Sequence, residues 1–245
     1  MTASGQAYYG HYGGLSVDDY VRLHVRGNAT EMDRMRRMVG LVPAGVASVL
    51  DVGAGHGVFL QELAAARGIT GTGIEITPAK VDYARSQGVD LRLGDAGALA
   101  FEDRAFDAVV CTEVLEHLPH GVYEAACAEL SRVADRWVLL SVPFDERRRF
   151  IACPYCGARV NPDYHFRSFA PGRIAGLLPG YRLHAEHHLG RSRHNPLVHW
   201  ARRFVERWPA MLLCPCCGYA PPAQPAAAAG AVVPAQSSLA RRLAT

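Results

Sequence analysis

Short apolar runs alternate along the first 142 residues with segments that carry apolar side chains at every third or fourth position. The helical spacing predicts amphipathic helices, two of them over residues 78–84 and 123–133. The apolar runs predict five buried strands, at residues 46–51, 69–76, 89–93, 105–112 and 137–142. Strands and helices that alternate with short connections predict an α/β fold with a doubly wound, mostly parallel sheet.

The first predicted strand runs directly into a glycine-rich turn. Asp51 is followed by Gly53, Gly55 and Gly57, and a helical pattern resumes at Phe59. Glycine allows positive φ and lets main-chain N–H groups approach a ligand without an intervening Cβ. The helix that follows presents its N-terminal amides to the same crevice. The stretch therefore predicts a binding site for a small polar cofactor.

The spacing of this turn narrows the choice of cofactor. A dinucleotide fingerprint has glycine or alanine at the position of Val58, and a phosphate-binding loop needs Gly-Lys-Ser/Thr, whereas the single lysine of the chain is Lys80. The remaining pattern, an acid followed by three alternating glycines, resembles motif I of the class I S-adenosylmethionine (SAM)-dependent methyltransferases. SAM carries an ammonium and a sulfonium, so a carboxylate at Asp51 suits it.

The next strands also end in side chains that could contact a nucleoside. Glu75 closes the second strand, where an acid accepts ribose hydroxyls in SAM and NAD enzymes alike. The resemblance implies that Asp95 takes the adenine amine and that Ala96 offers a backbone N–H to the ring. Cys111, near the end of the fourth strand, falls at the same crevice, although it also fits a buried small hydrophobe. Because parallel strands share one carboxyl edge, we expect these residues to converge.

A Glu-x-x-Glu-His-Leu run follows the fourth strand and strengthens the resemblance to small-molecule methyltransferases. Methyl transfer is an in-line displacement, so the protein must hold an acceptor oxygen or nitrogen near the methyl group and remove its proton. The candidate bases are His117 and His165, followed by Glu113, His11 and Tyr12. The alternative for His117 is that it only braces the sheet.

Two matched cysteine pairs lie beyond the predicted sheet. Cys153 and Cys156 form one Cys-Pro-x-Cys-Gly turn, and Cys214 and Cys217 form the other. Four thiolates with this spacing are typical of tetrahedral structural zinc, and Cys216 is a spare that could replace a neighbour. Seven cysteines used in this way fit a reducing compartment better than a disulfide framework.

The 245 residues divide into four predicted parts. These are an N-terminal helical and aromatic lid (1–40), a SAM-binding Rossmann-like core (41–145), an insertion and C-terminal part with the zinc knuckles and the substrate side (146–220), and a disordered tail rich in proline and alanine (221–245). The aromatic residues of the lid could instead pack on the domain surface. A further helix is expected over residues 171–178.

Charge and hydropathy bear on partners and location. The formal net charge of +3 gives little reason to expect a nucleic-acid partner. No apolar run reaches about 18 residues, the length that a membrane helix needs. The N-terminus has no basic start followed by an apolar run, so we expect a cytoplasmic protein. The oligomeric state is not indicated.

The resulting prediction is a SAM-dependent methyltransferase with a structural zinc that acts on an oxygen or nitrogen of a small molecule, such as a sugar or natural-product intermediate. Three alternatives stay open. Glu113, Glu116, His117 and His165 resemble the set that binds a divalent metal in small-RNA terminal 2′-O-methyltransferases, and residues 144–208 hold twelve arginines against five acids, which suits RNA phosphates. The others are a non-catalytic SAM-binding zinc module and a nicotinamide oxidoreductase.

Overall fold

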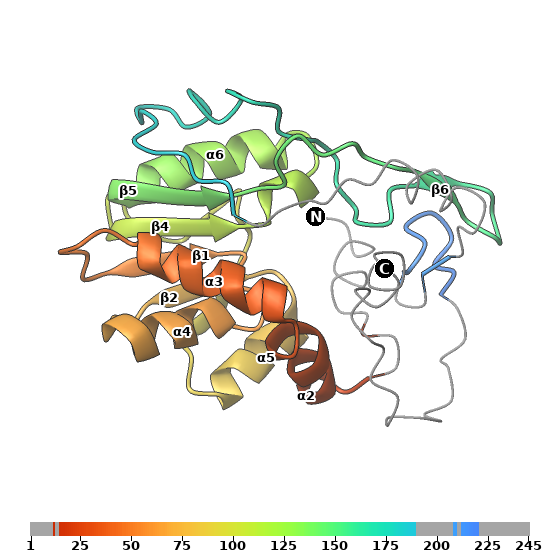
Figure 1. Ribbon diagram of the computed structural model, residues 1–245, viewed down its shortest axis with the longest axis horizontal. Helices are drawn as coiled ribbons and strands as arrows, with labels where there is room; N and C mark the ends of the chain where they lie inside the picture. The colour runs from red at the N-terminus through yellow and green to blue at the C-terminus, as the bar shows by residue number, and fades with distance from the viewer. Residues whose placement is uncertain (1–11, 13–14, 190–207, 210–211, 221–245) are drawn as a thin grey trace, which may run out of the picture.

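A five-stranded parallel sheet forms the centre of the molecule, in a computed structural model that describes residue 12 and residues 15–189, 208–209 and 212–220 (Figure 1). The strand order is β3-β2-β1-β4-β5. The strands are β1 (Val49–Val52), β2 (Thr72–Glu75), β3 (Leu91–Leu93), β4 (Phe106–Thr112) and β5 (Ala134–Ser141). The predicted doubly wound parallel sheet is confirmed.

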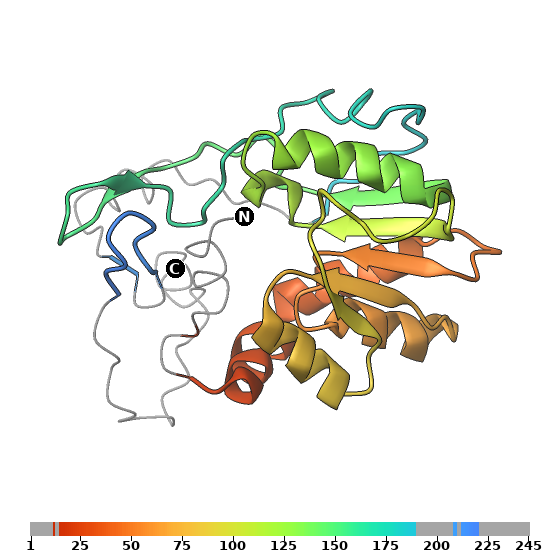
Figure 2. The ribbon, with the colours of Figure 1, turned by 180° about the vertical axis from the view of Figure 1, so that it is seen from behind.

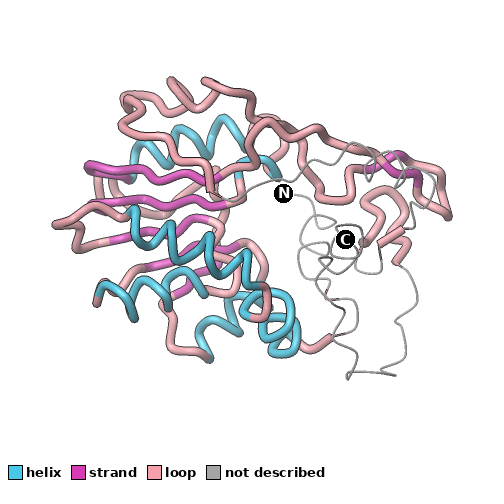
Figure 3. Tube along the Cα trace, viewed as in Figure 1, coloured by secondary structure: helices cyan, strands magenta, loops and turns pink. Residues whose placement is uncertain are grey.

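Helices cover both faces of this sheet (Figures 1, 2 and 3). One face carries α3 (Ala29–Leu41), α4 (Val58–Arg67) and α5 (Pro78–Ser86), and the other carries α6 (Val122–Val133). Three short helical elements complete the described set: α2 (Val17–Tyr20), the π-helix η1 (Val21–Arg26) and the 3-10 helix η2 (Leu115–His117).

Side chains of the central strands alternate between two apolar clusters. In β4, Ala108 and Val110 pack in the cluster with α3 and α4, whereas Val109 and Cys111 pack in the cluster with α6. A strand that is covered on both faces is apolar at consecutive positions. This is why the runs of valine, leucine and isoleucine located the strands in the sequence.

The strand order reverses between β1 and β4, and both strands point the same way. Such a reversal opens a crevice beyond the carboxyl ends of the two strands, where ligands of α/β proteins bind. The glycine turn follows β1 and the Glu-x-x-Glu-His run follows β4. Both motifs therefore border the same crevice.

The insertion after β5 extends from the carboxyl edge of the sheet (Figure 2). It contains the antiparallel pair β6 (Ile151–Ala152) and β7 (Arg159–Val160), which packs with Leu212 in a small separate cluster. The chain then returns along η2, where Arg167 donates to the carbonyl of Leu118 and its guanidinium lies 3.8 Å from the ring centroid of Tyr123. The cysteine-bearing part is thus anchored to the core.

Some expectations differ from the structure or lie outside its described part. The helix expected over residues 171–178 is wrong: the segment forms turns, because Gly172 and Gly176 adopt φ of +76° and +77°. The tail at 221–245 and most of the lid aromatics, including His11, lie outside the described residues. In the described part of the chain, every helix is too short or too polar to cross a bilayer.

Candidate functional site

The glycine turn after β1 has a backbone that only glycine adopts readily. Gly53, Gly55 and Gly57 have φ of +75°, +57° and +75°. A Cβ on Gly53 would lie 2.3 Å from Cγ2 of Val114, whereas a Cβ on Gly55 would enter open space. The N–H of Gly53 donates to the carbonyl of Ile74 at 2.8 Å, which ties the turn to β2. The turn is therefore fixed in place with room above Gly55.

Glu75 lies beside this turn at the carboxyl end of β2. Its side chain is buried, and its two carboxylate oxygens accept the backbone N–H groups of Gly55 at 3.0 Å and Thr77 at 2.9 Å. Each carboxylate oxygen has two lone pairs. One backbone donor per oxygen leaves capacity for a further donor, such as a hydroxyl group.

Asp51 lies on β1 with 2% of its surface exposed. Burial, reinforced by the negative charge of Glu75, raises the pKa of Asp51 to about 7. Two acids held together away from water favour a cation in the crevice, because a cation stabilises both ionised carboxylates. The ammonium and sulfonium groups of SAM supply that charge, so the donor set and the open space above Gly55 fit SAM.

The other predicted cofactor residues lie at the same edge of the sheet. Asp95 follows β3, and its Oδ1 accepts the N–H of Gly97 at 2.9 Å within its own turn. Ala96 is partly buried against the main core. Cys111 is buried in that core, and burial followed by the charge of Asp51 raises the pKa of its thiol. Their contacts with a cofactor stay predictions.

An aromatic cluster covers the glycine turn, and the sequence pattern indicated only part of it. The hydroxyl of Tyr12 lies 3.3 Å from Nε2 of His56, and the ring of Tyr20 lies 4.9 Å from that of Tyr12. Burial, then the positive charge of Lys80, lowers the pKa of His56 to about 4, so its ring is neutral at pH 7. The described end of the predicted lid therefore packs on His56, which lies between the second and third glycines of the turn.

A second cluster lies at η2, just beyond β4. Ligand atoms of Glu116, His117 and His165 all lie within 4.8 Å of one another. Glu116 is fully buried, and neither carboxyl oxygen has a hydrogen-bond partner in the described part of the chain. Burial, then the charge of Glu113, raises the pKa of Glu116 to about 8. Burial and the neighbouring His165 lower the pKa of His117 to about 4.

Glu113, the third candidate base, lies in a different network. Its Oε1 is 3.1 Å from the guanidinium of Arg34 and accepts the hydroxyl of Ser141. Its backbone has φ of +54°, which turns the chain away from β4. No sequence pattern indicated Arg34, because α3 lies far from β4 along the chain. The ion pair links α3 to the end of the sheet.

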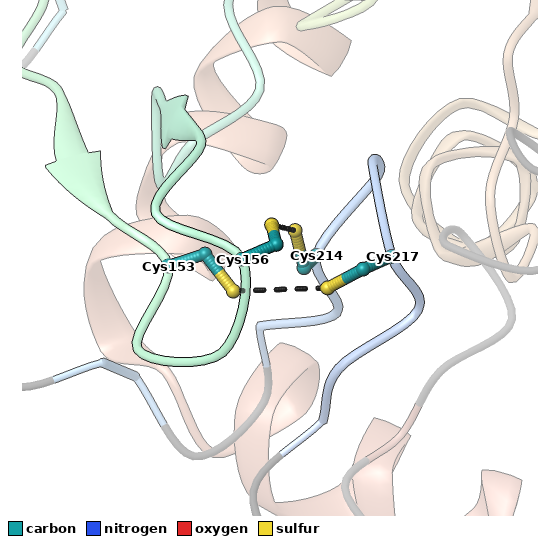
Figure 4. Close-up of side chains that lie close together, drawn as sticks. All are labelled: Cys153, Cys156, Cys214 and Cys217. Atoms are coloured by element: carbon teal, nitrogen blue, oxygen red, sulfur yellow. Dashed lines mark hydrogen bonds between the residues drawn. The ribbon is translucent and has the colours of Figure 1, made fainter.

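The four predicted zinc ligands converge although about sixty residues separate the two pairs (Figure 4). Sγ of Cys153 lies 3.8 Å from that of Cys217, and Sγ of Cys156 lies 3.8 Å from that of Cys214. Zinc–sulfur bonds of about 2.3 Å in a tetrahedron require sulfur–sulfur distances of about 3.8 Å. The sulfur positions therefore fit one zinc ion.

The two cysteine turns also share one backbone geometry. The N–H of Gly157 donates to the carbonyl of Cys153 at 2.9 Å, and that of Gly218 donates to the carbonyl of Cys214 at the same distance. Both glycines have φ of +72°. A conformation repeated at both pairs is what the shared Cys-Pro-x-Cys-Gly pattern predicted.

The five-stranded parallel sheet and the glycine turn after β1 form a Rossmann-like α/β fold, and this fold fits that of the class I methyltransferases. Residues 49–136 match a protein-family model of the methyltransferase domain. The match begins at β1 and ends within β5, so it covers the crevice but not the cysteine pairs.

Curated proteins that are similar to this chain include O-methyltransferases. The ubiquinone biosynthesis O-methyltransferase of Xanthomonas oryzae pv. oryzae (strain PXO99A) is 34% identical over 154 residues, which cover 57% of this chain and 64% of the relative. The enzyme of the same name from Xylella fastidiosa (strain 9a5c) is 39% identical over 103 residues, which cover 39% of this chain and 42% of the relative. The chain thus spans less than two thirds of the length of these relatives.

The chain is also similar in part to two solved structures. The [4+2]-cyclase SpnF is 24% identical, with a TM-score of 0.47 and coverage of 60% of this chain and 54% of its own. DesVI of Streptomyces venezuelae is 20% identical, with a TM-score of 0.47 and coverage of 57% and 66%.

Proposed function

We propose that the chain binds SAM in the crevice at the carboxyl ends of β1 and β2 and transfers the methyl group to an oxygen of a small molecule. The observation that carries the proposal is the buried acid pair, Asp51 and Glu75, beside the glycine turn. The name of the curated relatives, O-methyltransferase, favours oxygen over nitrogen as the acceptor atom. A sugar or natural-product hydroxyl remains our proposal for the acceptor.

Each residue of the crevice would bind a different part of the cofactor. Asp51 neutralises the ammonium group, Glu75 accepts the ribose hydroxyls with its remaining lone pairs, and Asp95 with Ala96 contacts the adenine ring. When bound, SAM supplies a methyl group already activated by its sulfonium. The remaining task of the chain is to orient the acceptor and remove its proton. We propose that the η2 cluster, formed by Glu116, His117 and His165, accepts this proton, because the cluster borders the same crevice.

The test of cofactor identity is calorimetric titration of the full chain with SAM and, separately, with NAD⁺. We expect SAM to bind at least about a hundredfold more tightly, because the acid pair attracts its positive charges and opposes a pyrophosphate. Equal affinities, or preference for NAD⁺, would reject the methyltransferase and favour an oxidoreductase. Tight SAM binding without transfer to any acceptor would favour the non-catalytic module.

A second candidate function is methyl transfer assisted by a divalent metal at Glu116, His117 and His165. It is supported by the two buried oxygens of Glu116, which have no hydrogen-bond partner among the described residues. One carboxylate and two imidazoles suit Mn²⁺, Co²⁺ or Fe²⁺. Such a metal would bind vicinal hydroxyls of the acceptor, and a terminal RNA ribose would then be the alternative substrate.

Replacing Glu116 by glutamine tests this candidate. Because the pKa of Glu116 is raised to about 8, the side chain is already protonated at pH 7, and we expect the neutral amide to leave the melting temperature within about 2 °C of wild type. If the metal site exists, the wild-type chain binds one Mn²⁺ in calorimetric titration and the variant binds it at least about tenfold more weakly. Identical Mn²⁺ titrations of the two proteins would rule the site out.

A further inference from the structure

His165 is contacted by a carboxylate that the sequence pattern did not indicate. Its Nδ1 lies 2.5 Å from Oε2 of Glu146, which precedes β6 in the insertion. Its ring meets that of His117 edge-on, with 4.8 Å between ring centroids. Glu116 is the other titratable group of the cluster, and Arg148 donates to the backbone carbonyl of His165. The charged or titratable neighbours described around the ring are therefore two acids, one histidine and one arginine.

The contact with Glu146 determines where the proton sits on the ring of His165. A carboxylate oxygen is an acceptor, so Nδ1 must carry the hydrogen. The remaining nitrogen of a neutral imidazole, Nε2, then has a free lone pair. His117 is held in the same way, because its Nδ1 lies 3.3 Å from the backbone carbonyl of Tyr164. Nε2 of His117 faces Glu116, 4.0 Å from Oε1.

Hydrogen bonds other than the Glu146–His165 contact also hold the two segments together. The N–H of Asp145 donates to the carbonyl of Phe169 at 2.8 Å, beside the side chain of Glu146. On the other side, Oδ1 of Asn161 accepts the backbone N–H of His165 at 3.0 Å, and Nδ2 of Asn161 donates to the carbonyl of Arg149. With the backbone fixed at both ends, the side-chain contact is left to set the orientation and tautomer of the imidazole.

We propose that Glu146 is a positioning residue that holds His165 as its Nδ1–H tautomer and presents Nε2 as the proton acceptor for methyl transfer. The role of Nε2 as proton acceptor rests on the proposed function. The Nδ1–H tautomer of His165 does not depend on it. In the step, the acceptor O–H proton moves to Nε2 of His165, a bond forms between the acceptor oxygen and the methyl carbon, and the carbon–sulfur bond breaks with its electron pair retained by sulfur. The carboxylate of Glu146 then stabilises the imidazolium, as in other carboxylate–histidine pairs.

The deciding measurement is the tautomer of His165, read from long-range ¹H–¹⁵N NMR spectra of the full-length, zinc-loaded protein. We expect the Nδ1–H form in wild type and in Glu146→Gln, because an amide oxygen still accepts the hydrogen bond. We expect the Nε2–H form to become the major species in Glu146→Ala. The matched control is Glu186→Gln, which alters a second acid–histidine pair, Glu186 and His188, 3.3 Å apart and outside the cluster.

Turnover of SAM with catechol as the probe acceptor gives the second readout. We expect Glu146→Ala to lower kcat at least about a hundredfold, Glu146→Gln to lower it less, and Glu146→Asp to recover part of the loss, with the KM for SAM unchanged in all three. An Nε2–H form in wild type, or the same tautomer in wild type and Glu146→Ala, would overturn the proposal. Failure of the proposed function would be seen separately, as a wild-type chain that does not bind SAM.

Discussion

We expect replacement of Asp51 by asparagine to weaken SAM binding at least about a hundredfold and to leave the ligand-free protein at least as stable as wild type. The affinity loss follows because a neutral amide cannot stabilise an ammonium group, and two decades of affinity correspond to about 2.7 kcal/mol. The stability follows from burial, which raises the pKa of Asp51 to about 7 from an ordinary value of 3.8. Ionised Asp51 therefore opposes folding unless a cation accompanies it.

The sign of the pH dependence can be worked out from this pKa. Between about pH 4 and pH 7 the unfolded chain has released the Asp51 proton while the folded chain still holds it, so the stability of the ligand-free protein falls as pH rises through this window. SAM binding has the opposite trend, because the ligand needs the ionised carboxylate. We expect the affinity to fall about tenfold per pH unit below pH 7 and to fall again above about pH 8, where the α-amino group of free SAM loses its proton.

Calorimetry at pH 6 and pH 8, with melting temperatures of the ligand-free proteins, measures both effects. Asp90→Asn is the matched control, since Asp90 is an acid at the opposite end of β3, exposed and paired with Arg92 at 3.0 Å. This variant should bind SAM as wild type does. An Asp51→Asn variant that binds SAM within threefold of wild type, or that melts well below it, would contradict the role given to Asp51.

We expect replacement of Cys153 by serine to abolish the proposed zinc binding and to unfold the insertion while SAM binding persists. Structural zinc supplies folding energy directly, about 10 kcal/mol or more in small zinc domains. Among the described residues, the apolar cluster around β6 and β7 has three buried members, Ile151, Val160 and Leu212, and so small a cluster gives little stability alone. The proposed SAM crevice is formed by β1, β2 and their turns, which do not include the cysteine pairs.

Metal analysis of the purified chain gives the result directly. We expect about one zinc per chain in wild type and in the control variant Cys216→Ser, and less than about 0.2 in Cys153→Ser. Limited proteolysis should then cut Cys153→Ser between residues 146 and 169. Full zinc content in Cys153→Ser, or its loss from Asp51→Asn, would show that the zinc and SAM sites had been assigned incorrectly.

Loss of zinc should also lower the rate of methyl transfer, because residues 164–167 of the insertion contact the η2 region. Tyr164 contacts His117, and the N–H of Phe166 donates to the carbonyl of Glu116 at 2.7 Å. Arg167 donates to two carbonyls of the η2 region. We therefore expect Cys153→Ser to reduce turnover more than SAM affinity, since the insertion positions the η2 cluster rather than the cofactor.

Features that depend on residues close together along the chain were predictable from the sequence. The strands were found because a strand buried on both faces is apolar at consecutive positions, and the turn after Asp51 was found because positive φ selects glycine. The same rule explains the failure at residues 171–178. Apolar spacing there suggested a helix, but Gly172 and Gly176 take positive φ and interrupt it.

The partners of the site residues were decided by the tertiary structure alone. Arg34 reaches Glu113, and Glu146 reaches His165, across separations that no local pattern encodes. Even the raised pKa of Asp51 depends on β1 and β2 lying side by side. The sequence by itself determined which residues could carry the chemistry, because residue type and spacing act locally. Only the packing of strands and insertion determined burial, charge and hydrogen-bond partners, because these depend on what lies nearby in space.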